Sequence, residues 1–524
     1  MTDIGTTTAT LAAQTQCTGD TPSNPCTYWF QYWADGATRT TSTSRTSISG
    51  AYTGAAGFDL TNLLPGTLYH NVFCGYGDSN LPANGWWCAG PDLAGQGYYV
   101  AKLLCQPQTS AACQALLASP DLSQAGAFRT GAAAGGGVPA ITGTPDIGRV
   151  LSTADLPASP ISRDDGQSVQ YADGKALWLF GDTQQYTPSG GSGFMGGTTA
   201  AFGAFAQGEA PQTLNEAPTP GTGALRTGLT APQPFLPSSP GLKVPGTTTP
   251  CTGTGNYSPA WTSGELLEDS GKVLITIGEV CVHNGALMDE GFGVMEWNPA
   301  TNSFTNGSTI NTVFKNTGAN GLPYQENLSH PVLGPQGSYI YLYSSSFSTD
   351  GTVPSGVYIA RVPAAQAATA TSASYQFWNG TTGTWVAAAN FAQATSMISF
   401  PSTIIPIGIS VGDFSATTNH NYVMLVKVLE TGVTTGTKAA MVIYSAPIPT
   451  GPWTKGPTVV IPDTCTGNIF GCYAIEGHPE LSYVGKFVYS YFSPDDQSGD
   501  GTARDGSGNQ VYAVGHIRLG TIDW

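Results

Sequence analysis

The sequence is poor in charge, and basic residues are the scarcest part of it. Only 10% of its 524 residues are charged, and Lys and Arg number 18 against 34 acidic residues. The net charge of -16 therefore comes from missing basic residues rather than from acidic runs. Because nucleic-acid binding needs Lys and Arg to neutralise phosphates, this composition argues against a nucleic-acid partner.

Long apolar runs are also missing. No stretch of 18 or more apolar residues occurs, so the sequence predicts no transmembrane span. The first residues, MTDIGTTTATL, lack the basic and apolar regions of a signal peptide. If the protein is exported, either a signal was removed before this numbering or export uses another route.

The ten cysteines show no CxxC spacing, and only six histidines accompany them, which argues against a zinc site. An even number of cysteines in five neighbouring couples instead fits disulfide bonds and an oxidising compartment. We therefore expect an extracellular or cell-surface protein with no metal in its site. The couples are Cys17 with Cys26, Cys74 with Cys88, Cys105 with Cys113, Cys251 with Cys281, and Cys465 with Cys472.

One short pattern recurs five times in the last three quarters of the chain. Each copy is a run of apolar, aromatic and β-branched residues that suits a buried strand, and each is followed by a second strand-like run. A unit of several short strands repeated five times predicts an all-β protein with a five-bladed β-propeller at residues 144–524. The copies are KALWLFGDT from Lys175, KVLITIGEV from Lys272, YIYLYSSSF from Tyr339, NYVMLVKVL from Asn421 and KFVYSYFS from Lys486.

A separate β-sandwich is expected at residues 1–130, joined to the propeller by the Gly- and Ala-rich linker 131–143. Its segment LLPGTLYHNVFCGYG resembles the corner of fibronectin type III modules, with Tyr69 in the place of their corner tyrosine. An insertion at about 79–124 departs from that pattern, carries three cysteines and could hold one or two short helices.

Propeller geometry gathers the acidic residues of the repeats on one face. The start of the first strand of a blade and the end of its second strand lie on the same side, since the two run antiparallel. In the first repeat this brings Asp164 and Asp165 of SRDDG to Asp182 of FGDT. The other residues expected on this face are Glu279, Glu326, His330, Glu476, His478 and Glu480, whereas Asp413, Asn419 and His420 belong to the opposite face.

Carboxylates paired in a pocket are what glycoside hydrolysis requires. One carboxyl group must be protonated to assist the leaving oxygen, and another must be ionised to attack or to activate water. We take Asp164, Asp182 and Glu326 as candidate catalytic acids. The candidate substrate-binding residues are Asp165, Trp261, Glu279, His330 and His478, and Tyr257, Tyr324 and Tyr473 are further aromatic residues that could stack on sugars.

Each of these residues also has a structural interpretation. Asp182 and Asp165 could close turns, Glu279 could be a rim residue, His478 could be a packing histidine, and the aromatic residues could belong to the core. The segment Asp496–Asn509 resembles the first half of an EF-hand loop but lacks the Glu that closes such a loop. A solvated hairpin loop is favoured there over calcium, and no cofactor is expected.

The segment RDDGQSVQYADGKALWLFGDT resembles the first blade of a family of secreted bacterial five-bladed β-propellers that includes endo-D-arabinanases. SGVYIARVPAA, MVIYSAPIPTGPW and YAIEGHPELSYVGKFVYSYF are similar to its later blades, so the resemblance covers about residues 145–520. It implies cleavage of furanosidic arabinan, with Asp164 and Asp182 as the paired acids. One scaffold hosts many functions, so a non-catalytic adhesin, lectin or structural surface protein is the competing hypothesis.

Overall fold

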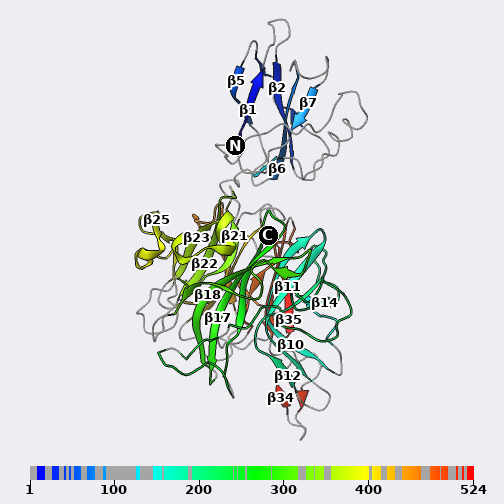
Figure 1. The fold of residues 1–524 in the computed structure, drawn as a ribbon, viewed down its shortest axis with the longest axis vertical. Coiled ribbons are helices and arrows are strands. Elements are labelled where there is room, and N and C mark those ends of the chain that lie inside the picture. The colour runs from blue at the N-terminus through cyan, green and yellow to red at the C-terminus, as the bar shows by residue number, and fades with distance from the viewer. Residues whose placement is uncertain are drawn as a thin grey trace. The chain divides into compact units, whose positions relative to one another are not determined.

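The chain divides into two compact units, Met1–Gly136 and Gly137–Trp524, and each is described by itself (Figure 1). The computed structural model describes residues 9–17, 26–34, 41–42, 46–48, 52–60, 68–76, 86–89, 126–129, 146–155, 159–186, 192–239, 241–244, 246–253, 256–284, 286–316, 326–334, 337–346, 356–400, 404–414, 422–430, 440–461, 472–483, 485–493, 503–504, 510–512 and 516–523. No helix in these ranges is long and apolar enough to cross a membrane.

The first unit contains two antiparallel sheets. One pairs β1 (Ala9–Cys17) with β5 (Tyr52–Leu60), and Leu11 and Leu60 in it are buried. The other sheet is built on β2 and β6, and its members are β2 (Cys26–Ala34), β3 (Thr41–Ser42), β4 (Thr46–Ile48), β6 (Leu68–Tyr76), β7 (Trp86–Ala89) and β8 (Gly126–Arg129). A fibronectin type III class for this unit stays a prediction, and the expected insertion lies outside the described residues apart from β7.

The second unit is a five-bladed β-propeller, as the five repeats predict. Blade 1 contains β10 (Ile161–Ala172), β11 (Lys175–Tyr186), β12 (Ser192–Met195), β13 (Thr199–Ala204) and β14 (Asn215–Glu216). Blade 2 contains β15 (Asn256–Tyr257), β16 (Ala260–Leu267), β17 (Val273–His283), β18 (Ala286–Asn298), β19 (Ser303–Phe304) and β20 (Asn311–Lys315).

The remaining blades follow the same antiparallel order. Blade 3 contains β21 (Ser329–Leu333), β22 (Tyr339–Ser346), β23 (Gly356–Pro363), β24 (Gln376–Asn379), β25 (Thr384–Ala387) and β26 (Ile398–Ser399), with three 3₁₀ turns η3 (Ala364–Thr369), η4 (Ser372–Ser374) and η5 (Ala388–Gln393). Blade 4 contains β27 (Ile404–Asp413), β28 (Tyr422–Glu430), β29 (Ala440–Ala446) and β30 (Thr454–Val460). Blade 5 contains β31 (Glu476–Gly477), β32 (Lys486–Ser493), β35 (His516–Asp523) and β9 (Asp146–Arg149), and β33 (Ala503–Arg504) pairs separately with β34 (Gln510–Tyr512).

The five repeated runs form the second strand of each blade, namely β11, β17, β22, β28 and β32. Every residue of 176–181 and 273–277 is buried, with no alternation of buried and exposed side chains. Neighbouring blades cover both faces of such a strand. A run of β-branched and aromatic residues with no polar face is therefore the pattern that this position requires.

The ring closes through a strand from the start of the unit. β9 pairs antiparallel with β35, so residues 146–149 complete the sheet that the last residues of the chain begin. The first strands of the blades contact one another in the order β10, β16, β21, β27, β31, and β31 contacts β10 again. Figure 1 shows β35 beside β10 and β11 although the whole propeller sequence separates them.

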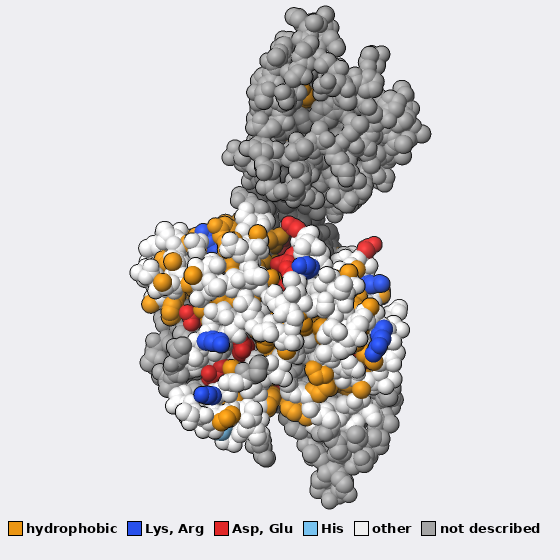
Figure 2. Space-filling view, viewed as in Figure 1, with side chains coloured by type: hydrophobic (Ala, Val, Ile, Leu, Met, Phe, Trp, Pro, Cys, Tyr) orange, Lys and Arg blue, Asp and Glu red, His pale blue; other side chains and the backbone are white. Residues whose placement is uncertain are grey.

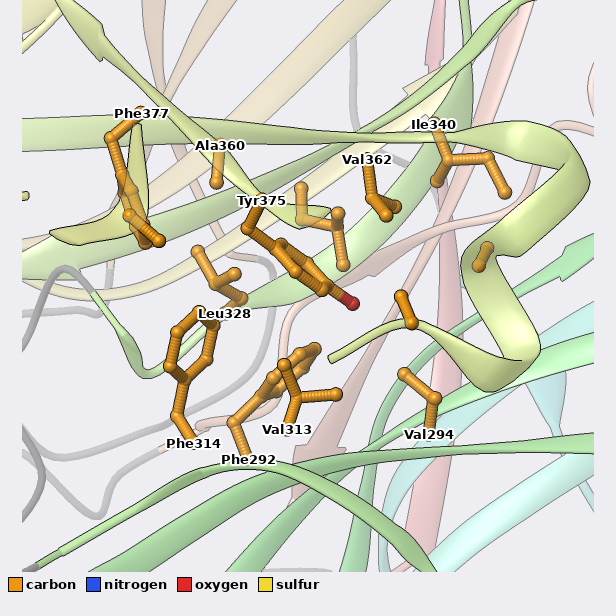
Figure 3. Close-up of a cluster of buried hydrophobic side chains, with 14 of the residues drawn as sticks. Phe292, Val294, Val313, Phe314, Leu328, Ile340, Ala360, Val362, Tyr375 and Phe377 are labelled. Carbon is orange, nitrogen blue, oxygen red and sulfur yellow. The ribbon is translucent and has the colours of Figure 1, made fainter. Parts of the chain in front are cut away.

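The core consists of separate apolar layers between adjacent blades. The layer between blades 2 and 3 joins Phe292 and Phe314 to Tyr375 and Phe377, with ring centroids 5.3 Å apart for Phe314 and Tyr375 (Figure 3). Comparable layers fill each of the other four gaps around the ring. Charged side chains are sparse on the described surface in Figure 2, as the composition predicts.

The predicted disulfide between Cys251 and Cys281 is confirmed, with an S–S distance of 2.04 Å. Cys281 lies within β17, and the bond ties the segment before β15 to the second strand of blade 2. Cys472 is also disulfide-bonded. The side chains of the other predicted couples lie outside the described residues.

Replacing both Cys251 and Cys281 by Ala should lower the free energy of unfolding by roughly 2–4 kcal/mol, because the bond closes a loop of 30 residues in the unfolded chain. Urea unfolding of the variant and the wild type measures the difference. An unchanged urea midpoint would contradict a stabilising role for this bond.

Candidate active site

The acidic motifs of blade 1 meet at an irregular point of the sheet. The register of β10 and β11 shifts around Asp164, so that this residue faces Gly181 and Asp182, which bulge out of β11. Bulges change the direction of side chains and are frequent beside active sites. The convergence of SRDDG and FGDT that the repeat geometry predicts therefore occurs within a single pair of strands.

Gly181 leaves room for two carboxyl groups to lie together. A methyl group at this position would lie 2.2 Å from Oδ1 of Asp164 and 2.6 Å from Oδ2 of Asp165. Both oxygens therefore point to one spot over β11, and only glycine fits beneath them. Asp165 has a φ of +63°, a left-handed conformation that costs a non-glycine residue roughly 1–2 kcal/mol. Such strain is concentrated at functional sites.

Asp164 has few hydrogen-bond donors around it. The hydroxyl of Tyr473 donates to its Oδ2 at 3.1 Å, whereas its Oδ1 is buried and has no partner among the described residues. Burial, followed by the charges of Asp165 and Asp182, raises the pKa of Asp164 well above its ordinary value. Compared with Asp182, which faces it, Asp164 is therefore the carboxyl group better suited to keep a proton.

Asp182 has the opposite surroundings. Its Oδ1 accepts hydrogen bonds from the Trp261 indole at 2.7 Å and from the Gly197 amide at 2.9 Å, and its Oδ2 accepts one from the Tyr257 hydroxyl. Burial raises the pKa of Asp182, but these three donors oppose the rise because they favour the ionised form. Trp261 and Tyr257 thus hold a carboxylate, and a stacking role for either remains a prediction.

A cavity of about 410 Å³ lies on the propeller axis and is lined by the first strands of all five blades. Along β16 and β21 the lining changes from the polar residues Glu265 and His330 to the apolar residues Leu266 and Val332. Glu476 of β31 lines the polar part, and no Lys or Arg contributes to the described lining.

Carboxyl groups around this cavity repel one another. Burial and then Glu476 and Asp182 raise the pKa of Asp165 to about 8, and burial raises the pKa of Glu476 to about 8 against hydrogen bonds from Ser410 and Gln167. Burial and the neighbouring acids also raise the pKa of Glu265 well above its usual range, and its Oε2 is buried without a described partner. Asp165 and Glu476 are therefore mostly protonated at slightly acidic pH.

His330 and His478 lie near the axis in different ways. His330 lines the cavity with a φ of +48°, and its Nδ1 lies 3.6 Å from Glu476. Burial lowers the pKa of His330 to about 4, so between about pH 4 and 8 this contact joins two neutral groups. His478 is completely buried, packs on Trp178 at 4.8 Å and contacts the Ser168 hydroxyl, which also donates to Glu480. Among the described contacts, His478 thus positions Ser168.

Two predicted residues lie apart from the blade 1 acids. Glu279 packs against the glycines of β18 and accepts a hydrogen bond from Thr312, which fits its structural interpretation. Glu326 is half-buried just before β21, burial raises its pKa, and it makes no hydrogen bond or ion pair with a described residue. Tyr324 and the EF-hand-like segment Asp496–Asn509, apart from β33, lie outside the described residues, and no group of described side chains is arranged to hold a metal ion.

Sequence reasoning missed Glu265 and Phe194. Glu265 lies in the first strand of blade 2, the strand that lines the axis, and this position was the available signal. Phe194 of β12 is 51% exposed, and its ring packs edge-on against Tyr257 at 5.4 Å. An exposed aromatic ring beside the Asp182 donors offers a surface on which a sugar ring could stack.

A known family model matches part of the second unit. Residues 289–510 match a family model described as a domain of unknown function (DUF5005), which is less than half of the chain. No curated protein matches the sequence.

Solved structures with the propeller fold include several glycoside hydrolases. A family 117 glycoside hydrolase from Zobellia galactanivorans matches 72% of this chain and 89% of its own at 9% identity and a TM-score of 0.36. An arabinanase from Bacillus subtilis matches 69% and 95% at 10% identity and 0.33, and a levansucrase from the same organism matches 66% and 82% at 8% identity and 0.34. At these TM-scores the likeness carries no argument about the chemistry of this chain.

The raised pKa values predict that the propeller loses stability as the pH increases. A carboxyl group with a raised folded-state pKa contributes fully below its unfolded pKa, and the contribution is lost as pH rises through the folded value. For Glu476 this window runs from about pH 4.5 to about pH 8. Between pH 5 and pH 8, Glu476→Gln should lose roughly 1–3 kcal/mol less free energy of unfolding than the wild type does. Urea unfolding at the two pH values measures this difference.

The matched control is Glu209→Gln, which makes the same chemical change at an exposed position. It should keep the pH dependence of the wild type. An equal loss of stability between pH 5 and pH 8 in wild type and Glu476→Gln would refute the role assigned to this carboxyl group.

Proposed function

We propose that this protein is a secreted glycoside hydrolase that cleaves a furanosidic, arabinan-like polysaccharide. The observation that carries the proposal is the contrast between Asp164 and Asp182, which face each other across a β-bulge. Asp164 has a buried oxygen without a described partner, whereas Asp182 accepts three described hydrogen bonds. Two neighbouring carboxyl groups in unlike environments are typical of an acid and base pair.

In this proposal Asp164 is the general acid. It gives its proton to the oxygen of the leaving sugar while the bond from the anomeric carbon to that oxygen breaks. Asp182, kept ionised by its donors, either attacks the anomeric carbon or takes a proton from the attacking water. Asp165 lies next to Asp164, and any negative charge on it raises the pKa of Asp164, which makes early loss of the Asp164 proton unfavourable.

The substrate class comes from the resemblance of the blade 1 motif to endo-D-arabinanases. The absence of Lys and Arg from the described lining of the axial cavity supports a neutral polymer over an anionic one. The confirmed disulfide supports an oxidising compartment, and therefore secretion.

The direct test is hydrolysis of a panel of arabinans and other furanose polymers, with release of reducing ends as the measurement. Asp164→Asn should lower kcat by about 10²–10⁴-fold, because it removes the transferable proton but keeps the size of the side chain. Asp173→Asn makes the same change in the exposed hairpin between β10 and β11 and should retain activity. Turnover by Asp164→Asn at the wild-type rate, or no turnover by folded wild type, would contradict the proposal.

Phe194 favours a second candidate function, carbohydrate binding without hydrolysis. Its exposed ring lies beside Tyr257 and needs no catalytic acid in order to hold a sugar. A surface lectin or adhesin would use this platform alone, and binding to glycans without release of product would identify it.

Phe194→Ala should weaken glycan binding by about 2–10-fold, because it removes stacking worth about 0.5–1.5 kcal/mol. If the protein is a hydrolase, KM should rise while kcat changes little. Leu287→Ala, another truncation of an exposed apolar side chain, is the control and should bind glycan as the wild type does. Unchanged glycan affinity in Phe194→Ala would exclude this platform.

A further inference from the structure

We propose that Tyr473 is a positioning residue that stabilises the carboxylate formed when Asp164 gives up its proton. The part of this inference that concerns catalysis rests on the proposed hydrolase function. The part that concerns the ionisation of Asp164 does not, and the two can be tested separately.

The contact itself joins blade 5 to blade 1. The Tyr473 hydroxyl donates to Oδ2 of Asp164 at 3.1 Å, across 309 positions of sequence. Burial and the nearby carboxyl groups raise the pKa of Tyr473, so its hydroxyl stays protonated and remains a donor at any working pH. A hydrogen bond to an acceptor that becomes charged is roughly twice as strong as one to a neutral acceptor. The bond therefore strengthens as negative charge develops on Asp164.

Other groups around Asp164 make this donor more important. Asp165 faces it from β10 and Asp182 from β11, and both disfavour its ionised form. Arg163, the neighbouring cation, forms a buried ion pair at 2.6 Å with Glu216 instead. The amide of Asp182 provides a backbone hydrogen bond, and Oδ1 has no described partner. Tyr473 is therefore the side-chain donor that the described residues provide for the new charge.

The backbone holds Tyr473 in place. It lies between Cys472, with a φ of +44°, and Ala474, with a φ of +50°, two left-handed residues that are not glycine. Cys472 is completely buried and disulfide-bonded. On the other side, the Phe492 amide donates to the Tyr473 carbonyl at 2.9 Å, and the two rings lie 4.7 Å apart. Two strained residues flanking one side chain are expected where its direction matters.

The test is the titration of Asp164 in wild type and Tyr473→Phe, followed by NMR of ¹³C-labelled carboxyl groups and assigned with Asp164→Asn. Loss of the hydroxyl should raise the pKa of Asp164 by about one pH unit. The alkaline limb of the kcat profile should move up by the same amount, and kcat should fall about 10-fold or more. A merely structural role would lower activity without moving either titration.

Two comparisons sharpen the result. Tyr257→Phe removes one of three described donors of Asp182 and should leave the Asp164 titration nearly unchanged. Tyr483→Phe, at a partly exposed tyrosine outside the site, should match the wild type in every measurement. Should Tyr473→Phe not fold, 3-fluorotyrosine at position 473 keeps the hydroxyl and makes it a stronger donor, so the pKa of Asp164 should fall.

The two proposals fail in different ways. If no furanose polymer is hydrolysed by wild type but Tyr473→Phe still raises the pKa of Asp164, the hydrolase function is wrong and the effect of Tyr473 on this carboxyl group stands. If wild type hydrolyses arabinan and Tyr473→Phe leaves the Asp164 titration and the kcat profile in place, the inference about Tyr473 is overturned and the function stands.

Discussion

The pairing of β9 with β35 is the interaction on which the candidate site depends. It closes the sheet of blade 5 with residues from the start of the propeller and so seats blade 5 beside blade 1. Blade 5 in this place brings Tyr473 to Asp164 and Glu476 near Asp165. The local motif around the β-bulge supplies the acids, but the closure of the ring supplies the groups that control their protonation.

A protein with so few charges places several of its carboxyl groups where they are least solvated. Burying an ionised carboxylate without a partner is strongly unfavourable, so the group keeps a proton instead. Glu265, Glu476 and Asp165 follow this rule around the axis, since their pKa values all rise. The pKa of Asp182 rises less than burial alone would cause, because three hydrogen-bond donors replace the water that this carboxylate loses. The number of hydrogen-bond donors around a carboxyl group, more than its depth of burial, thus decides whether the group keeps its proton or releases it.

The fold was largely predictable because its strongest signal is local. A second strand covered on both faces must be apolar throughout, and five such runs are visible without any structure. The meeting of Asp164 with Asp182 followed from the antiparallel order of two strands. The closing strand was not predictable, since the four residues DIGR carry no pattern, and the roles of Glu265 and Trp261 depend on neighbours in other blades. The sequence around His478 is equally compatible with a histidine that lines a cavity and with one that packs on Trp178, as it does in the structure.

The closing strand also has a mechanical meaning. Residues 1–145 are joined to the propeller through β9, and β9 is held in blade 5 by its ladder with β35. A pull transmitted along the chain from the N-terminal unit would therefore load this short ladder before any other blade. The force would be borne where the ring is closed, while the apolar layer of Trp178, Ile517 and Leu519 would still join blade 5 to blade 1.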